Sequence, residues 1–319
     1  LIQAIKRGDK VVAAVAPAFV SQFGENVTSS QMREAMRQVG FHKVIEVAVG
    51  ADMCTAEEAE DFLKKVPAEQ PFMATSCCPS WSVMAKKLFP QFKDYISMAM
   101  TPMVLTARLY KKDHPDVRIV FIGPCTAKKL EASRRTIRSD VDFVLTFEEM
   151  QGIFDAKGIV PSEMPVDPEE EFSTGTSLGR GFAVTGGVAN AVKEAIKEID
   201  PDREVKIEHA DGLRECRKML MMAKAGKYNG YLLEGMGCPG GCVNGGGQPQ
   251  QPGYIRNTVD IRGLRAKVLY DSDEANTIRK SHENTAIKEL YATYLGEPGS
   301  EKAHHLLHTS YVKRSINQH

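Results

Sequence analysis

The sequence has no uninterrupted apolar run approaching about 18 residues, although 42% of its 319 positions are hydrophobic. This absence excludes a membrane-spanning helix, which needs about 20 consecutive apolar residues. Neither charge sign is in excess, because 41 lysine and arginine residues balance 41 aspartate and glutamate residues. The balance argues against a general nucleic-acid binder, which would carry a basic excess or stripe. No charged-then-apolar segment opens the chain, so we expect no secretory signal and a reducing, cytoplasmic compartment.

Regularly spaced cysteines are also absent. The seven cysteines form an odd set, with one adjacent pair and no Cys-x-x-Cys motif. A secreted disulfide framework is therefore disfavoured, and in a reducing compartment clustered cysteines more often serve metal or redox chemistry. The seven are Cys54, Cys77, Cys78, Cys125, Cys216, Cys238 and Cys242.

Strand-like apolar runs alternate with helical patterns along most of the chain, which predicts an α/β fold with largely parallel sheets. We predict strands over 11–16, 44–49, 72–75, 117–122, 143–145, 182–184, 205–207 and 231–233. We predict helices over 29–39, 55–66, 82–89, 148–157 and 213–225, and breaker-rich surface loops over 161–175 and 245–253.

About eight strands fit two small sheets better than one. We therefore expect two lobes, approximately residues 1–105 and 106–250, each a small, mostly parallel sheet flanked by helices. The active site is expected in the cleft between them, because ligands of open α/β sheets bind beyond the carboxyl ends of the strands. The polar and helical residues 251–319 are expected to wrap across the body.

Five cysteines lie in three loops that each follow a predicted strand, so these loops can converge on one point. Cys77 and Cys78 occupy the first loop, Cys125 the second, and Cys238 and Cys242 the third. Four thiolates suit a cubane iron–sulfur cluster, and zinc also accepts four. We favour iron–sulfur, because zinc usually takes Cys-x-x-Cys pairs and because Pro-Gly-Gly inside the third loop lets bare backbone lie against a bulky cluster.

The adjacent Cys77 and Cys78 cannot comfortably bind the same cluster. Neighbouring side chains on extended backbone point to opposite sides. One thiol is therefore expected to be a ligand and the other to serve as an acid or base, since a thiol with a pKa of about 8.5 can pass a proton near neutrality.

These three loops resemble the three signature loops of [FeFe]-hydrogenases. The motifs TSCCPxW, PCxxKxxE and CPGGCxxGGGQP occur here at residues 75–81, 124–131 and 238–249, in the family's order, and the likeness covers nearly the whole chain. The resemblance implies that residues 1–319 form a single H-cluster domain, and that further iron–sulfur domains precede Leu1 in the full protein.

The resemblance also implies the cofactor and its ligands. Cys78, Cys125, Cys238 and Cys242 would hold a [4Fe–4S] cluster, and Cys242 would also bridge to a diiron subcluster bearing CO, cyanide and an azadithiolate. Cys77 would exchange a proton with the azadithiolate amine, and Lys128 would pair with a cyanide ligand. The positions matching the lining of the diiron pocket are Pro17, Ala18, Met103, Gly123, Phe182 and Met236.

A proton relay through two carboxylates and a hydroxyl is a further implication. The matching positions are Glu57, Glu60 and Ser97, and the two glutamates are three residues apart on one predicted helix face. The alternative is that they belong to a solvated acidic face. Glu58 has a separate explanation as the partner of Thr55 in a helix capping box.

Several positions depart from the best-known members of the family. Gly123 stands where many have Met, Met103 where many have Gln, and Ala183 where many have Gly. Gly237 and Ser80 replace a frequent Ala and a frequent Gly. These differences suggest a divergent subgroup, because the residues around a metal centre tune its potential and access.

The motif His304-His305-Leu-Leu-His308 places two histidines four residues apart, which is a spacing that can hold zinc. It lacks the glutamate of H-E-x-x-H, and the tail of the resembling family often carries histidine here, so we interpret it as structural. Cys54 and Cys216 lie outside the three motifs and are also interpreted as structural.

Taken together, the resemblance implies a hydrogenase that interconverts H2 with two protons and two electrons. Its expected partners are a ferredoxin or another redox protein, and maturation proteins that insert the diiron subcluster. Two alternatives remain: an H2 sensor with low turnover, and a non-enzymatic hydrogenase-like protein of iron–sulfur assembly. The retained Cys77 and Lys128 disfavour the latter.

Overall fold

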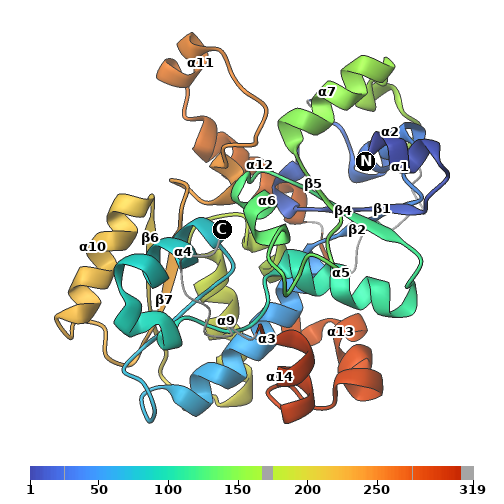
Figure 1. Ribbon diagram of the computed structural model, residues 1–319. Coiled ribbons are helices and arrows are strands. Elements are labelled where there is room, and N and C mark those ends of the chain that lie inside the picture. The colour runs from blue at the N-terminus through green and yellow to red at the C-terminus, as the bar shows by residue number, and fades with distance from the viewer. Residues whose placement is uncertain (25, 167–174, 275, 310–319) are drawn as a thin grey trace.

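The computed structural model describes residues 1–309 except 25, 167–174 and 275, and residues 310–319 also lie outside the described part. Within these residues, seven strands form two parallel sheets with helices on both faces (Figure 1). The first sheet has the order β2-β1-β4-β5, and the second has the order β3-β7-β6. This arrangement confirms the predicted α/β fold with small parallel sheets.

The lobe boundary predicted near residue 105 is wrong. The first sheet contains β1 (Val11–Val15), β2 (Lys43–Glu46), β4 (Arg118–Gly123) and β5 (Phe143–Thr146). The second contains β3 (Met73–Ala74), β6 (Lys206–Asp211) and β7 (Tyr231–Met236). Each sheet therefore draws strands from both sides of the expected boundary, because parallel strands pair through long crossovers that need not keep sequence neighbours together.

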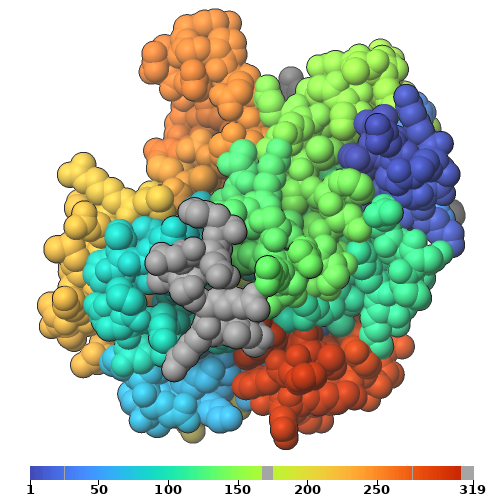
Figure 2. Space-filling view, in the orientation of Figure 1, coloured from blue at the N-terminus to red at the C-terminus, as the bar shows by residue number. Residues whose placement is uncertain are grey.

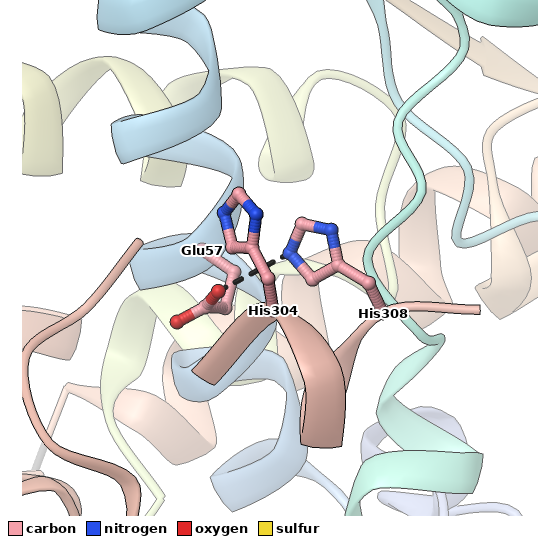
Figure 3. Close-up of side chains that lie close together, drawn as sticks. All are labelled: Glu57, His304 and His308. Carbon is pink, nitrogen blue, oxygen red and sulfur yellow. Dashed lines mark hydrogen bonds and ion pairs between the residues drawn. The ribbon is translucent and has the colours of Figure 1, made fainter. Parts of the chain in front are cut away.

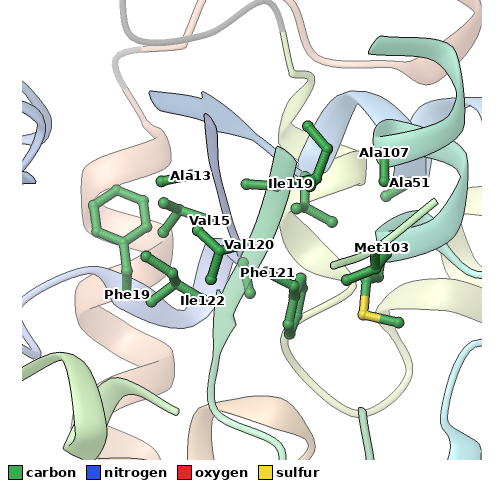
Figure 4. Packing of buried hydrophobic residues seen from close by; sticks show 14 of the residues in the cluster. Ala13, Val15, Phe19, Ala51, Met103, Ala107, Ile119, Val120, Phe121 and Ile122 are labelled. Atoms are coloured by element: carbon green, nitrogen blue, oxygen red, sulfur yellow. The ribbon is translucent and has the colours of Figure 1, made fainter. Parts of the chain in front are cut away.

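The first sheet is buried on both faces, which explains why its central strands are continuous apolar runs. Ile119 and Phe121 of β4 point toward α3 (Ala48–Lys65) and α5 (Pro102–Asp113). Val120 and Ile122 point to the other face, toward Phe19 (Figure 4). On that face lie α2 (Ser29–Val39) and α7 (Phe147–Lys157).

The second sheet is also covered on both faces. One face packs against α4 (Pro79–Leu88) and α10 (Leu213–Lys224), and the other against α3 and α9 (Gly187–Ile199). Helix α3 is thus shared, since Ala51 packs in the core of the first sheet and Phe62 in a cluster with residues of the second. One helix therefore connects the two sheets beside the site.

Two local predictions are wrong in an informative way. Helix α3 begins at Ala48 and not at Thr55, so the second half of the predicted strand over 44–49 is the first turn of this helix. A short apolar run fits a strand and a buried helix equally well, and periodicity alone cannot separate them. The strand predicted over 182–184 is absent, because Phe182 directly follows α8 (Ser177–Gly181) in a turn.

Other helices begin and end where their capping residues indicate. Helix α2 has the predicted bounds, starts with a capping box between Thr28 and Gln31, and ends at Gly40 in a left-handed conformation. The same devices bound α7, which starts at a capping box between Thr146 and Glu149. The remaining helices before residue 250 are α1 (Ile2–Lys6) and α6 (Ala127–Ala132), and the short 3₁₀ helices include η1 (Pro17–Phe19).

In the described part, the segment after residue 250 consists mainly of short helices and the turns between them. It contains α11 (Gly253–Thr258), α12 (Ile261–Asp273), α13 (Thr285–Leu290), the π-helical turn η6 (Tyr291–Leu295) and α14 (Glu301–Leu307). Figure 2 shows α11 standing out from the body of the protein. The red residues of α13 and α14 lie against that body. The loop predicted over 161–175 contains one turn of 3₁₀ helix at Pro161–Glu163, and its part 167–174 lies outside the described residues.

Buried Asp52 of α3 anchors this C-terminal segment. Its carboxylate accepts hydrogen bonds from the Ser281 hydroxyl at 2.7 Å and from the Asn284 amide at 2.9 Å, and also from Thr176 N at 3.0 Å. The backbone around Leu307 then pairs with residues 98–100, where Met100 N donates to Leu307 O at 2.8 Å. In the described part, no helix has the length and apolar character that crossing a membrane requires.

Candidate active site between the two sheets

The three cysteine loops each follow a strand and converge between the sheets, as predicted. Cys77 and Cys78 come after β3, Cys125 after β4, and Cys238 after β7. Because β4 belongs to the first sheet and the other two strands to the second, the site is built from both. Gly237 N donates to Cys78 Sγ at 3.3 Å, and Gly247 N donates to Pro124 O at 2.8 Å, so all three loops are joined.

Four thiols face one another at this junction. Burial, and then the neighbouring Cys125 and Cys78, raise the pKa of Cys242 and Cys238. In the described part, no three of these sulfur atoms lie within 4.8 Å of one another. A single zinc ion with Zn–S bonds of about 2.3 Å needs a tighter set, whereas a cubane cluster has its four thiolates spread around it. The donor set therefore fits the iron–sulfur cluster that the sequence indicated.

Glycines let the third loop lie directly against the second. A Cβ atom on Gly245 would come within 2.2 Å of Pro124 O, and one on Gly247 within 2.6 Å of the Thr146 side chain. Any other residue would push the two loops apart. The Gly-Gly-Gly run therefore sets how closely Cys242 approaches Cys125.

An apolar cavity of about 70 Å³ adjoins the cysteines on the side of the first sheet. Five of the six lining residues implied by the resemblance border it, together with Cys77, Cys78, Cys125, Cys242 and Lys128. These five are Pro17, Ala18, Met103, Phe182 and Met236.

The sixth expected lining residue, Gly123, does not border the cavity. A Cβ atom on Gly123 would lie 2.6 Å from the Phe121 ring, so this ring takes up the space beside the glycine. Phe121 is the residue that lines the cavity instead. Sequence reasoning missed it because strand position, not composition, turns Phe121 toward the site.

Lys128 is buried at the edge of the cavity, and its ammonium is held by two acceptors. Nζ lies 2.7 Å from Glu131 Oε2 and donates to Cys77 O at 3.2 Å. Burial lowers the pKa of Lys128, but the Glu131 carboxylate and the nearby thiols outweigh it and raise the pKa above the ordinary value. The lysine is therefore a fixed positive charge that borders the cavity.

The carboxylate beside Cys77 is Glu58, not Glu57. Glu58 is fully buried, and burial raises its pKa to about 8, with the Ser97 side chain and the Ser76 backbone only partly offsetting this effect. Neither carboxylate oxygen makes a hydrogen bond of good geometry among the described residues, although Ser97 and Ser76 lie close by. Burial, followed by the charge of Glu58, raises the pKa of Cys77.

The two glutamates predicted for the relay point elsewhere. Glu57 faces the C-terminal segment, where Tyr291 Oη donates to its Oε1 at 2.6 Å. Glu60 is part-exposed and packs against Gly299. Because α3 starts at Ala48, Thr55 is not a helix cap: its hydroxyl donates to Ala51 O inside the helix.

A rotation of 100° per helical residue separates Glu57 from Glu58, so a shift of one position turns a side chain to another face. Asp61, one turn after Glu58, is also buried, and its charge adds to the raised pKa of Glu58. Its Oδ2 accepts from Lys65 Nζ at 2.7 Å. Ser97, which the resemblance grouped with Glu57 and Glu60, lies beside Glu58. Glu57, Glu58 and Asp61 are all buried on α3, so burial gives no signal that singles out Glu58 and Asp61.

Two family models match this chain. The model described as "Iron only hydrogenase large subunit, C-terminal domain" matches residues 9–246, and the model described as "Iron hydrogenase small subunit" matches residues 259–314. The chain belongs to the iron-only hydrogenase family. It is a hydrogenase-like H-cluster domain of that family, with the predicted fold.

Curated relatives and solved structures agree with this assignment. Iron hydrogenase 1 of Clostridium pasteurianum is 33% identical over 95% of this chain and 60% of its own length. The NADP-reducing hydrogenase subunit HndD of Solidesulfovibrio fructosivorans is 32% identical over 98% of this chain and 62% of its own length. The [FeFe]-hydrogenase structure of HydA(deltaEFG) matches with a TM-score of 0.77 and 32% identity, covering 95% of this chain and 94% of the other.

The iron-only hydrogenase family also includes relatives with other names. The cytosolic iron-sulfur assembly component 3 of Bos taurus is 26% identical over 91% of this chain and 70% of its own length. This chain spans about three fifths of the length of the hydrogenases named above. Family membership therefore establishes a hydrogenase-like iron–sulfur protein, and the activity has to be argued from the site.

Proposed function

We propose that this protein is a hydrogenase that interconverts H2 with two protons and two electrons. The supporting observation is the apolar cavity, which is bordered by Cys77 and by three of the four proposed cluster cysteines, Cys78, Cys125 and Cys242, while the buried Glu58 lies beside Cys77. A protein that only carries an iron–sulfur cluster has no use for an apolar cavity with a buried lysine at its edge and a proton-holding carboxylate beside the adjoining free thiol.

The cofactor is assigned to residues whose chemistry suits it. Cys78, Cys125, Cys238 and Cys242 would hold the [4Fe–4S] cluster, and Cys242, which also borders the cavity, would in addition help to hold the diiron subcluster with its CO, cyanide and azadithiolate ligands. The Lys128 ammonium provides a positive charge for an anionic ligand such as cyanide. When bound, the diiron subcluster supplies the redox chemistry, while the protein supplies position, a dry environment and a proton route.

The proton route begins at Cys77 and continues to Glu58. A raised pKa keeps the Cys77 thiol protonated at neutral pH, so it can donate a proton and recover one. Glu58, with a pKa of about 8, holds a proton near neutrality, and in the described part its oxygens make no hydrogen bond of good geometry that would fix that proton. Ser97 and Asp61 lie next to Glu58, and Asp61 is ion-paired to Lys65, which is part-exposed. We therefore assign to Glu58 and Asp61 the roles that the resemblance first gave to Glu57 and Glu60.

The proposal also covers electron transfer and cofactor assembly, which follow from the chemistry of the cofactor. A ferredoxin or another redox protein would exchange electrons with the cubane, and maturation proteins would insert the diiron subcluster. A cytoplasmic, reducing location would keep the seven thiols free for cluster assembly.

The decisive experiment is an infrared spectrum of anaerobically prepared protein whose cubane is intact by electron paramagnetic resonance. A synthetic diiron precursor is added, and the region where metal-bound CO and cyanide absorb is recorded before and after exposure to H2. Sharp bands that change under H2 are expected. Their absence in protein with an intact cubane would contradict the proposal. It would favour a role in iron–sulfur assembly, which is consistent with the similarity to the assembly component.

Turnover then separates an enzyme from a sensor. An enzyme with the infrared bands is expected to consume or evolve H2 at a rate that Cys77→Ala abolishes. An H2 sensor would show the same bands with low turnover, and this is the second candidate. Both share the cofactor, so the loss of the bands would exclude both.

A further inference from the structure

Two pairs of side chains meet between α3 and α14, away from the cysteine loops. Glu57 and Asp61 are one helical turn apart on α3, and His304 and His308 are one turn apart at α14. His308 Nε2 lies 3.2 Å from Glu57 Oε2, and His304 Nε2 lies 3.3 Å from Asp61 Oδ1. Figure 3 shows the His308 imidazole reaching the Glu57 carboxylate, with the His304 ring beside it.

Each carboxylate is held by one oxygen, and its other oxygen faces an imidazole. Tyr291 Oη donates to Glu57 Oε1 at 2.6 Å, and Lys65 Nζ donates to Asp61 Oδ2 at 2.7 Å. Asp61 Oδ1 and His304 Nε2 are buried and make no hydrogen bond among the described residues. Side chains oriented by such outer contacts, with a donor atom left over, are typical of metal sites.

The charges of this cluster are also unbalanced. Glu57 is fully buried, and among the described residues it forms no ion pair with a lysine or an arginine. Asp61 is 1% exposed, and in the described part of the chain Lys65 is the one lysine or arginine with which it forms an ion pair. A buried carboxylate is costly without a compensating cation, and a divalent ion bound by neutral imidazoles would supply it.

We propose that Glu57, His304 and His308 bind a divalent transition metal ion such as Zn²⁺, with the fourth position left to water. One ligand atom from each of these three residues lies within 4.8 Å of the others. Nitrogen and oxygen donors of this kind suit Zn²⁺, which takes four ligands at about 2.0–2.2 Å. The carboxylate that the His304–His308 motif lacks in sequence comes from α3 in space, so the motif is more than structural.

Such an ion would fasten the C-terminal segment to the helix that both sheets share. Beyond His308, Thr309 N pairs with Met98 O at 2.8 Å, next to Ser97. The site uses none of the cluster cysteines, so its existence does not depend on the proposed hydrogenase activity.

Cobalt is the probe that separates this site from the thiols. Full-length chain with its cubane reconstituted, so that the cluster cysteines are occupied, is treated anaerobically with a chelator and titrated with Co²⁺. We expect one Co²⁺ per chain with visible d–d absorption and without the thiolate-to-metal charge transfer that a cysteine ligand produces. Zn²⁺ is expected to displace it and to raise the thermal unfolding midpoint.

The variants His304→Ala and His308→Ala are expected to lose at least about tenfold in affinity for Co²⁺, together with the metal-dependent rise in unfolding temperature. His305→Ala is the matched control, because His305 is an exposed residue of the same helix. Glu57→Gln, which keeps the size of the side chain, tests the site if an alanine variant fails to fold.

The proposal is overturned if wild-type protein binds no Co²⁺ beyond ions with a thiolate signature. It is equally overturned if folded His304→Ala, His308→Ala or Glu57→Gln protein binds Co²⁺ as tightly as the His305→Ala control. None of these measurements needs the diiron subcluster, so they are independent of whether H2 is turned over.

Discussion

The Lys128 ammonium lies 2.7 Å from the Glu131 carboxylate and, through the same Nζ, donates to the carbonyl of Cys77 at 3.2 Å. One buried ion pair thereby connects the second cysteine loop to the first. The arrangement fixes the position of the positive charge at the cavity and also the backbone of the residue that we propose exchanges the proton. Glu131 is the last residue of the motif PCxxKxxE, so its place in the motif has a physical reason.

Replacing Glu131 by Gln is expected to destabilise the fold by about 3–5 kcal/mol, because it leaves the buried Lys128 charge without its partner. Chemical unfolding of both proteins with the same cluster content measures this difference. Glu215→Gln is the matched control: Glu215 pairs with Lys218 at the same spacing, but both are half-exposed, so about 1 kcal/mol or less is expected. Equal effects at the two sites would contradict a special role for the buried pair.

The free energy of unfolding is expected to fall as the pH rises from about 4.5 to about 8, in part because of Glu58. Its pKa is about 8 in the folded protein and 4.5 as the ordinary value, so in this window the folded state binds more protons than the unfolded state. The slope from this one group approaches about 1.36 kcal/mol per pH unit and levels off above pH 8.

The variant Glu58→Gln is expected to lack this part of the decline, whereas Glu69→Gln, at an exposed position, keeps it. Denaturant unfolding at several pH values between about 5 and about 9, which cover most of this window and its upper end, checks the prediction. A Glu58→Gln profile parallel to that of wild type would mean that the buried carboxylate is not protonated in the folded state.

Turnover of H2 is expected to fall by about 10²-fold or more in Glu58→Gln, the range for loss of a positioned proton-transfer group. Glu60→Gln is expected to retain most of the activity, because Glu60 is part-exposed and turned away from Cys77. Rates are compared in protein with equal infrared intensity of the diiron bands. If Glu60→Gln lowered turnover more than Glu58→Gln did, the result would instead support the relay through Glu57 and Glu60 that the resemblance first implied.

Phe121 and Gly123 are expected to be coupled, because a Cβ atom on Gly123 would lie 2.6 Å from the Phe121 ring. Gly123→Ala alone is expected to cost about 1–3 kcal/mol through overpacking, and Phe121→Ala alone about 3–5 kcal/mol through the cavity it leaves. The double variant should cost less than the sum, with a coupling energy of about 0.5–3 kcal/mol. Unfolding of the four proteins gives this energy, and strict additivity would rule out the contact.

Much of the site could be predicted from the sequence, because its chemistry lies in contiguous motifs. Cys78, Cys125 and Cys238 each follow a strand whose apolar run is visible in the sequence, and the loops that carry them meet as expected. The cap residues of α2 likewise predicted its bounds, because Thr28 and Gly40 act on their immediate neighbours. Local signals of this kind need no knowledge of the rest of the chain.

The proton-handling residues could not be assigned in this way. Whether Glu57 or Glu58 faces Cys77 depends on where α3 begins, and the run before Thr55 suited a strand as well as a helix. Likewise, nothing local tells Phe121 from other apolar strand residues, although Gly123 two positions later makes room for its ring. A shift of one residue on a helix or a strand changes the face, and only packing decides it.

The sequence by itself therefore determined the fold class and the family, and it located the four cysteines that we propose as cluster ligands, since these depend on strand patterns and on motifs of adjacent residues. Only the tertiary structure decided which strands share a sheet, which carboxylate lies beside Cys77, and that Glu57 meets His308 across more than two hundred residues of chain. The physical reason is that long-range pairing is set by burial of whole faces, and burial is a property of the folded chain and not of any segment of it.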